Sequence, residues 1–333
     1  MVSIAADPAD GNWRNLRLFF DPERFNVLNN PNPIAPSLFQ DRAMIAYLCE
    51  SCGLQYERST LPPASCPVCE DERQYVAAKG QTWITMPQLA ATHAPRIERD
   101  AGLLGLGISP PFGIDQRALI ITTPKLRVMW EATSLVTPDA VRAITAEGPI
   151  DLIAISHPHF YAAMVEWSDA LGGVPILIHA ADARWIARRS PRLVLWTGLR
   201  RQIAPGLQLV HCGGHFPGSA VLHWREGANG RGALFAGDAL QVTRDGQHVS
   251  FMYSYPNLIP LSPDAVRHIA ASIADLEFDD VHGFTWGRNI IGGGKAAVAR
   301  SVARYLAAIA PAAAPWDSNP PPEEDFTCAT RLS

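Results

Sequence analysis

Four cysteines in two closely spaced pairs restrict the folding of this chain more than any other feature of its sequence. Cys49 and Cys52 form one C-x-x-C pair, and Cys66 and Cys69 form a second pair after thirteen intervening residues. Two residues between thiolates allow a tight turn to aim both sulfurs at one ion, and two such turns complete a tetrahedral four-sulfur site. Two disulfides or four unrelated thiols are the alternatives, and the absence of a secretion signal disfavours the disulfides. The spacing therefore predicts a metal-stabilised module over residues 41–80 that folds only with its ion.

The segment CESCGLQYERSTLPPASCPVC, residues 49–69, resembles the rubredoxin-like knuckle domain at the end of rubrerythrins. This resemblance leaves two metals open, zinc as in a structural zinc ribbon or iron, because both accept four thiolates. Nothing nearby is typical of an electron-transfer partner, which favours structural zinc. A closed site of this kind stabilises a fold but has no open position for catalysis.

The composition excludes several classes of protein. The chain has 333 residues, of which 47% are hydrophobic, enough to bury a large core. Its 28 Lys and Arg against 32 Asp and Glu give a net charge of −4, which does not favour nucleic-acid binding. No uninterrupted apolar run is long enough for a membrane span, and the first residues lack the basic and apolar segments of a secretory signal. We therefore expect a cytoplasmic protein with a small-molecule substrate; homo-oligomerisation stays open.

The pattern along the chain divides it into four parts. Residues 1–40 are expected to form an extended arm, 41–80 the four-cysteine zinc ribbon, 81–310 the main domain and 311–333 a loose tail. Within the main domain, the Gly- and Pro-rich stretch that ends residues 81–117 predicts a turn-rich connection. Beyond it, short apolar runs predict strands, and Pro residues after Thr137 and Ser262 predict helix starts. The expected strands are 118–122, 126–131, 151–155, 175–178, 193–196, 207–210, 220–224 and 233–236; the expected helices are 138–146, 161–171, 263–276 and 295–310.

Three histidines and one aspartate follow these predicted strands. His157 and His159 lie two residues apart just beyond the strand 151–155, where an extended backbone would turn both rings to one face. His215 lies in a glycine-rich loop after the strand 207–210, and Asp238 follows the strand 233–236. Each residue alone is a weak signal, but together they predict a mixed nitrogen and oxygen site. Such a site suits zinc, iron or manganese, with room for water.

The order of these motifs resembles that of the metallo-β-lactamase superfamily. His157-Pro158-His159, the segment GHFPGS at residues 214–219 and the segment FAGD at 235–238 match its H-x-H, G-H-x-P-G-S and F-x-G-D motifs. The resemblance covers roughly residues 100–310 and implies an α+β fold, the four-layer αβ/βα sandwich. It also implies that the three histidines hold the first metal ion, with Asp238 as a fourth ligand or as the group that orients water. The implied activity is metal-dependent hydrolysis.

The sequence departs from this family at the second metal site. Where the family continues H-x-H-x-D-H, this chain has Tyr161 and Ala162, neither of which is a good ligand. We therefore expect a single ion, with Asp238 taking a larger catalytic part. Tyr161 is a candidate hydrogen-bond donor to an oxyanion or leaving group, or otherwise a packing residue. His282 lies in about the place of the family's final ligand; the alternative is a loop histidine beside an aromatic segment.

An ion held by three imidazoles lowers the pKa of bound water towards 7 and so supplies a nucleophile. Thioesters, lactones, other esters and amides are all open as substrates. Arg288 is a candidate for binding a substrate carboxylate, with a surface ion pair as the alternative, and Trp286 is a candidate for an apolar substrate wall. The glycines at 292–294 lack the spacing and the lysine–hydroxyl pair of a phosphate loop.

Two other functions remain as hypotheses. Flavodiiron proteins join the same sandwich to rubredoxin-like knuckles, so a redox protein is one, although this chain has no room for a flavodoxin domain. A binding module that has lost catalysis is the other.

Overall fold

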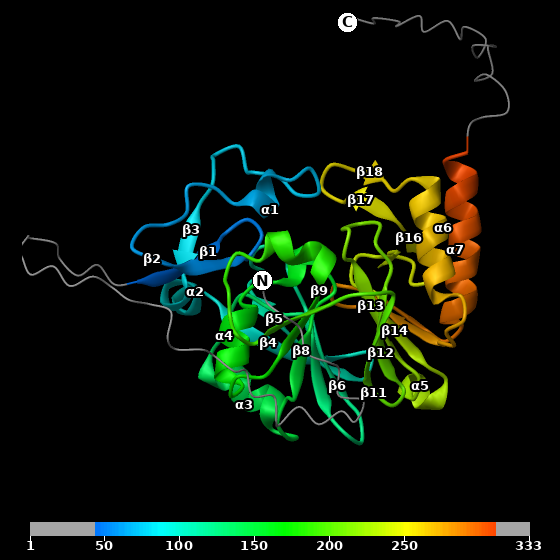
Figure 1. Cartoon of the computed structure of the whole chain (residues 1–333), viewed down its shortest axis with the longest axis horizontal. Coiled ribbons are helices and arrows are strands. Elements are labelled where there is room, and N and C mark those ends of the chain that lie inside the picture. Colours follow the sequence, from blue (N-terminus) through cyan, green and yellow to red (C-terminus); the bar gives the residue numbers. More distant parts are fainter. Residues whose placement is uncertain (1–43, 311–333) are drawn as a thin grey trace, which may run out of the picture.

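The computed structural model describes residues 44–310, so the predicted arm at 1–40 and the tail at 311–333 lie outside the described residues. Two large sheets face each other in this part of the chain, with helices on both outer surfaces (Figure 1). This arrangement confirms the four-layer αβ/βα sandwich of the metallo-β-lactamase fold. None of the helices between residues 44 and 310 is long and apolar enough to cross a membrane.

The first large sheet has seven strands in the order β10-β9-β8-β7-β6-β5-β4. Its antiparallel half is a meander, whereas β7, β8, β9 and β10 run parallel and are joined by helical crossovers. Its strands are β4 Ala94–Asp100, β5 Leu103–Ser109, β6 Ala118–Thr122, β7 Arg127–Trp130, β8 Leu152–Ala154, β9 Ile176–His179 and β10 Leu193–Trp196.

The second large sheet has six strands in the order β11-β12-β13-β14-β19-β20. The pair β14 and β19 is parallel, and the other neighbours are antiparallel. Its strands are β11 Arg200–Ala204, β12 Leu207–His211, β13 Ala220–Trp224, β14 Ala233–Phe235, β19 Asp280–His282 and β20 Asn289–Ile291.

Alternation along the strands separates the two faces of each sheet. In β6, Leu119 and Ile121 belong to the buried cluster between the sheets, whereas Ile120 belongs to the cluster beneath the outer helices. Both faces are apolar because both are covered, as expected for the inner layers of a four-layer fold.

Helices α3 (Pro138–Thr145) and α4 (Met164–Ala170) cover the first sheet, and α6 (Pro263–Ile273) and α7 (Gly294–Ala308) cover the second (Figure 1). The predicted helix starts are confirmed, because the side chains of Thr137 and Ser262 accept hydrogen bonds from the third backbone N–H of their helices. The short elements that connect the layers are the 3₁₀ helices η2 (Pro158–Phe160) and η3 (Ala180–Trp185), α5 (Gly227–Gly230), and the strands β15 Gln241–Val242, β16 Val249–Ser250, β17 Met252–Ser254 and β18 Ile259–Pro260.

The cysteine pairs lie in a small three-stranded sheet of order β2-β1-β3, followed by a short helix. Its elements are β1 Ile45–Cys49, β2 Gln55–Ser59, α1 Pro67–Glu70, β3 Trp83–Thr85 and α2 Met86–Thr92. The third strand comes after residue 80, the predicted end of this module. Buried side chains of the module, such as Leu48 and Val68, share one apolar cluster with Ile153 and Trp167 of the main domain. The module therefore packs directly on the first sheet and α4.

The prediction of a turn-rich connection at the end of residues 81–117 holds for residues 110–117, which lie outside the strands and contain a turn, and is wrong for residues 105–109, which belong to β5. Strands β4 and β5 pair over their full length and extend the first sheet. Gly105 and Gly107 lie within β5, where a Cβ atom would come 2.8 Å from the ring of Trp286. These glycines make room for a tryptophan that crosses the strand, so here glycine marks close packing and not a turn.

Candidate metal centres

His157, His159, His215 and Asp238 meet in one buried cluster between the two large sheets. His157 and His159 follow β8 of the first sheet, whereas His215 and Asp238 come from the loops after β12 and β14 of the second. The four residues are at most 5% exposed. The strand ends therefore bring together the four residues that the motifs singled out, and we call this cluster the histidine site.

The spacing of the donor atoms suits one tetrahedral ion. Asp238 Oδ2 lies 3.4 Å from His157 Nε2, 3.9 Å from His159 Nδ1 and 3.6 Å from His215 Nε2. The two nitrogens of His159 and His215 are 3.2 Å apart. In a tetrahedron the ligands lie about 1.6 bond lengths apart, so ligands at about 2.0–2.1 Å from zinc would be about 3.3–3.4 Å from one another. The donor set and its size both fit an ion such as zinc.

The backbone presents the two neighbouring histidines differently from what the sequence predicts. His157 itself is extended, but residues 158–160 form the 3₁₀ helix η2 and not a continued strand. The two rings consequently offer different nitrogens to the cluster, Nε2 from His157 and Nδ1 from His159. Both rings reach one cluster, as predicted, but an extended backbone is not the reason. Pro158 opens a helical turn and cannot extend the ladder of β8.

Hydrogen bonds from the opposite ring nitrogens hold two of the histidines in position. Ser156 Oγ lies 2.7 Å from His157 Nδ1, and the N–H of Ser156 donates to Glu131 Oε2 at 3.1 Å. His215 Nδ1 lies 3.1 Å from the carbonyl oxygen of Met252, which can only accept, so this nitrogen carries the proton. His215 Nε2 is then unprotonated and free to ligate, the arrangement typical of metal-binding histidines.

Burial and mutual charge shape the electrostatics of the site. Burial lowers the pKa of His159 and His215 below that of free histidine, so both favour the neutral form that binds metals. For Asp238, burial acts to raise the pKa, but the three histidines outweigh it and hold the pKa of this carboxyl below its usual range. The site therefore favours neutral imidazoles at His159 and His215 beside an ionised Asp238, a donor set suited to a divalent cation.

Several buried polar atoms here lack a hydrogen-bond partner within residues 44–310. They include His157 Nε2, Asp238 Oδ1 and the hydroxyl of Tyr255. Buried polar atoms are almost always paired, so a group of orphans around one point indicates a missing ligand. The residues therefore fit a bound ion together with a water or substrate oxygen.

The two positions that normally complete a second metal site have other contacts. Tyr161 is fully buried, and its hydroxyl donates to the carbonyl oxygen of Asp182 at 3.2 Å. Ala162 adopts a positive φ of 38°, and its carbonyl accepts the N–H of Gln55 at 3.0 Å. Neither residue supplies a ligand to the histidine site.

The sequence left two roles open for His282, a metal ligand or a histidine beside an aromatic segment. His282 ends β19, where its ring stacks on Phe235 at 4.8 Å and its Nδ1 lies 3.2 Å from Asn289 Oδ1. It is not among the residues whose donor atoms meet at the histidine site. The side chain is turned into the layer between the sheets, because its position on β19 places it beside the inward-facing Phe235 of β14.

The two residues predicted to bind substrate behave differently. Trp286 packs its ring against Gly105 and Gly107, and the guanidinium carbon of Arg96 lies 4.2 Å from the ring centre. This ring is thus used for packing on the first sheet. Arg288 is partly exposed in the turn after β19, with its carbonyl accepting the N–H of Gly283, and its role in binding a substrate carboxylate stays a prediction.

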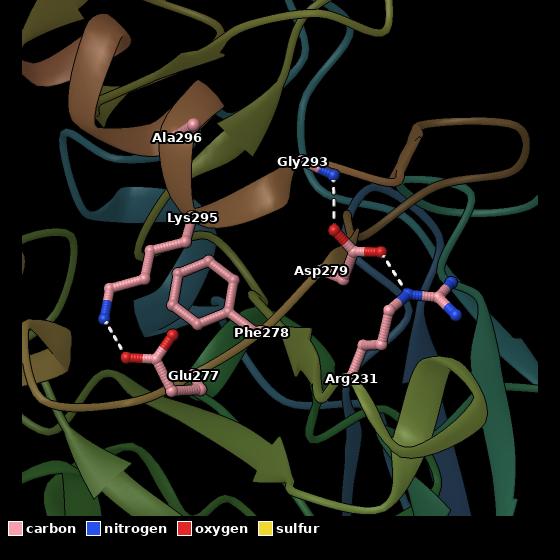
Figure 2. Close-up of a pocket in the computed structure, with 7 residues that line it drawn as sticks. All are labelled: Arg231, Glu277, Phe278, Asp279, Gly293, Lys295 and Ala296. Carbon is pink, nitrogen blue, oxygen red and sulfur yellow. Dashed lines mark hydrogen bonds and ion pairs between the residues drawn. The ribbon is translucent and has the colours of Figure 1, made fainter.

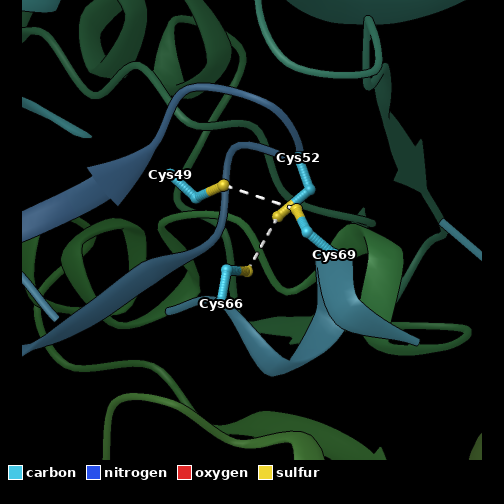
Figure 3. Close-up of side chains that lie close together, drawn as sticks. All are labelled: Cys49, Cys52, Cys66 and Cys69. Carbon is cyan, nitrogen blue, oxygen red and sulfur yellow. Dashed lines mark hydrogen bonds between the residues drawn. The ribbon is translucent and has the colours of Figure 1, made fainter. Parts of the chain in front are cut away.

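The four cysteines form a second buried cluster, shown in Figure 3. Cys49 Sγ lies 3.5 Å from Cys69 Sγ, and Cys52 Sγ lies 3.6 Å from Cys66 Sγ. These distances exclude disulfides, whose sulfurs are about 2.05 Å apart, and approach the separation of about 3.8 Å for tetrahedral thiolates around zinc. Gln81 Nε2 also donates to Cys49 Sγ at 3.0 Å. The predicted four-sulfur site is therefore assembled, and we call it the cysteine site.

The likeness of this chain to a protein of Bacillus subtilis (strain 168), named "Uncharacterized protein YmaE", decides its family. The two are 38% identical over 266 residues, which cover 79% of this chain and 96% of YmaE. This chain belongs to the YmaE family. No family model matches it.

Solved structures with similar folds include two metallo-β-lactamases. One, from Hirschia baltica, has a TM-score of 0.42 and 17% identity, covering 60% of this chain and 94% of its own. The other, FIM-1 from Pseudomonas aeruginosa in its mono-zinc form, has a TM-score of 0.46 and 14% identity, covering 65% and 96%. Both TM-scores are below 0.5. The fold of this YmaE relative is therefore assigned from its own paired sheets and motifs and not from these two structures.

Three acidic or aromatic residues that the motifs did not indicate also adjoin the histidine site of this YmaE relative. Glu131 is fully buried, and burial raises its pKa to about 8. Asp182 Oδ1 accepts the N–H of Gly218 in the loop of His215 at 2.8 Å. The ring of Tyr255 lies 5.6 Å from that of His215. Glu131 and Asp182 follow no recognisable motif, so only their position in space reveals them, whereas Tyr255 belongs to a set of aromatic residues that could be expected to line a pocket.

A hollow of about 290 Å³ lies at the start of α7, beside the glycines at 292–294 (Figure 2). Asp279 accepts the N–H of Gly293 at 2.6 Å and pairs with Arg231 at 2.5 Å. Lys295 pairs with Glu277 at 2.6 Å. Both cations of this hollow are thus paired with carboxylates.

Proposed function

We propose that this chain is a metal-dependent hydrolase that acts on a small ester, lactone, thioester or amide. The observation that supports it is the meeting of four buried donor atoms at the spacing of one tetrahedral ion, beside a carboxylate oxygen without a partner. His157, His159 and His215 would hold the ion with Asp238. When bound, such an ion acts as a Lewis acid and makes water a nucleophile at neutral pH.

Asp238 is the proposed proton acceptor of the reaction. Its Oδ2 faces the three histidine nitrogens, whereas its Oδ1 is buried and has no partner within residues 44–310. A carboxylate kept ionised by its neighbours can accept a hydrogen bond from an attacking water through Oδ1 and take its proton. Ser156 and Met252 hold the rings of His157 and His215 in place, so these two side chains do not need to move when an ion binds.

Tyr255 is the better candidate than Tyr161 for hydrogen bonding to the substrate. The hydroxyl of Tyr161 already donates to Asp182, whereas that of Tyr255 is buried without a partner within the described residues. Burial and then the negative charge of Asp238 raise the pKa of Tyr255, so its phenol stays protonated and able to donate. It would stabilise negative charge that develops on a substrate oxygen.

A single ion at the histidine site is part of the proposal. Ala162 has no donor and Tyr161 is engaged, and only two groups of three or more candidate ligands occur within residues 44–310. The cysteine site would hold a structural zinc. A cytoplasmic location is proposed because four free thiols persist in a reducing compartment.

Elemental analysis tests the metal assignment. We expect about two zinc ions per wild-type chain and one in the His157→Ala/His159→Ala variant, which should also lose turnover of ester, lactone, thioester and amide substrates. One zinc in both proteins would contradict the proposal. Iron, seen as a red chromophore that bleaches on reduction, would favour the redox hypothesis.

Kinetics of two variants test the tyrosine assignment. Tyr255→Phe should lower kcat by about 10²–10³-fold, the usual cost of one oxyanion donor. Tyr161→Phe, which removes a hydroxyl bonded to the protein backbone, should lower stability and leave kcat nearly unchanged. The reverse pattern would restore Tyr161 as the donor.

A further inference from the structure

The four-cysteine module touches both histidine loops, and each cysteine pair is linked to a different loop. The first pair, Cys49 and Cys52, is linked to the loop of His159. The second pair, Cys66 and Cys69, is linked to the loop of His215. Two buried polar side chains make these links, and neither belongs to a metal ligand.

Gln116 makes the first link. Its side-chain amide donates one hydrogen bond to the carbonyl of Cys52 at 2.6 Å and another to the carbonyl of His159 at 3.1 Å. The side chain is 1% exposed, so water cannot replace either bond. A Cβ atom at Gly113 would lie only 3.0 Å from the N atom of Gly53, so this loop packs tightly against the first cysteine turn. The side-chain amide of Gln116 is therefore hydrogen-bonded to the backbone of one ligand from each site, Cys52 and His159.

Arg73 makes the second link. It follows α1, the helix that carries Cys69, and Asp71 fixes its guanidinium through two bonds of 2.6 and 2.8 Å. Nη1 of Arg73 donates to the carbonyl of His215 at 3.2 Å, and its guanidinium carbon lies 3.9 Å from the centre of the Phe216 ring. Arg73 is 5% exposed, and a cation so buried is held in one geometry by its partners.

We propose that Gln116 and Arg73 are positioning residues through which the cysteine site holds the two histidine loops at the spacing that an ion requires. An ion at the cysteine site ties the two cysteine pairs together, and each pair carries one histidine loop with it. Filling the cysteine site then raises the affinity of the histidine site, and by linkage the reverse also holds. This inference rests on the proposed metal binding at the histidine site.

Arg188 provides a matched control at the same interface. It is also buried, pairs with Glu166 of α4 at 2.7 Å and hydrogen-bonds to Gln55 of the module. Among residues 44–310, its hydrogen bonds and ion pairs go to Gln55, Glu166 and Asp169 and not to a histidine loop. Replacing Arg188 therefore weakens the docking of the module without cutting either link.

The experiment is a cobalt titration of the full chain. Cobalt bound to four thiolates and cobalt bound to nitrogen and oxygen ligands absorb differently, so both sites can be followed in one sample. The variants are Gln116→Met and Arg73→Lys, with Arg188→Lys as the control and circular dichroism to verify folding. Gln116→Met and Arg73→Lys cut different links, so either one tests the inference if the other does not fold.

We expect both link variants to bind cobalt on the order of 10–100-fold more weakly at the histidine site, with an unchanged thiolate spectrum. Arg188→Lys should lower the unfolding temperature and keep the affinity of wild type. Unchanged affinity in a folded link variant, or an equal loss in Arg188→Lys, would overturn the inference. Failure of the wild-type histidine site to bind cobalt would instead overturn the proposed function, and this inference with it.

Discussion

The cysteine site and the histidine site are both buried clusters of four donors, but the chain assembles them in different ways. All four cysteines come from residues 49–69, on two turns of one small module. The histidine site takes its donors from loops after β8, β12 and β14, which belong to opposite sheets of the sandwich. A local site needs only the right spacing, whereas a dispersed site depends on the whole fold.

The two sites also differ in what remains unpaired. The four sulfurs close their site, and Gln81 adds a hydrogen bond to one of them. At the histidine site, Asp238 Oδ1 and the hydroxyl of Tyr255 are buried without partners within residues 44–310. A closed site stabilises, whereas a site with unpaired buried groups is suited to bind and activate a further molecule.

The largest expected effect is loss of the cysteine site. Cys52→Ser should lower the free energy of unfolding by about 5 kcal/mol or more, because binding of structural zinc contributes directly to folding. The ion count should fall by at least one per chain. Thermal unfolding and elemental analysis measure both.

The control for this variant is Cys212→Ser, which alters a buried free cysteine outside both sites. Cys212→Ser should lower the free energy of unfolding by less than Cys52→Ser does, and it should leave the ion count unchanged. If Cys52→Ser lowered the free energy of unfolding no more than Cys212→Ser does, the contrast between a stabilising and a reactive site would fail.

The next effect in size is the pH dependence due to His282. Burial lowers its pKa to about 4 in the folded chain, against about 6.5 in the unfolded chain. The unfolded chain then binds more protons between these values, so stability is full above pH 6.5 and falls by about 3 kcal/mol as the pH drops to 4. Denaturant unfolding of wild type and His282→Gln at several pH values measures this component.

His282→Gln should flatten that pH dependence and leave the ion count unchanged. Loss of an ion in this variant would mean that His282 belongs to the histidine site after all.

A smaller effect is expected for Ser156→Ala, which removes the hydrogen bond to His157 Nδ1. Affinity of the histidine site should fall on the order of 10–100-fold, as is usual when the partner of a metal-binding histidine is lost. Zinc competition with a chelator measures it. The control is Ser168→Ala, which removes a buried hydroxyl that donates to the carbonyl of Val174 and should not change this affinity.

The smallest expected effect is that of Gln81→Ala at the cysteine site. Removing one hydrogen bond to Cys49 should lower stability by about 0.5–1.5 kcal/mol, measured by denaturant unfolding. The histidine site should not respond to it. A loss as large as that of Cys52→Ser would show that hydrogen bonds, and not the thiolates alone, govern this site.

Much of the secondary structure could be predicted because its signals are local. Thr137 and Ser262 begin helices with their own side chains, and the hairpin of β6 and β7 follows from two apolar runs around a short turn. The strand β5 could not be predicted in this way. Its glycines resemble a turn until Trp286, nearly 180 residues later, is seen to pack on them.

The same division applies to function. Spacing alone determined the cysteine site, because two short turns contain all its ligands, and the order of motifs indicated His157, His159, His215 and Asp238. Only the tertiary structure decided that His282 faces the layer between the sheets, that the hydroxyl of Tyr161 has a partner, and that Gln116 and Arg73 join the two sites. These are contacts between residues far apart in the chain, and their geometry is determined by packing, which no local pattern encodes.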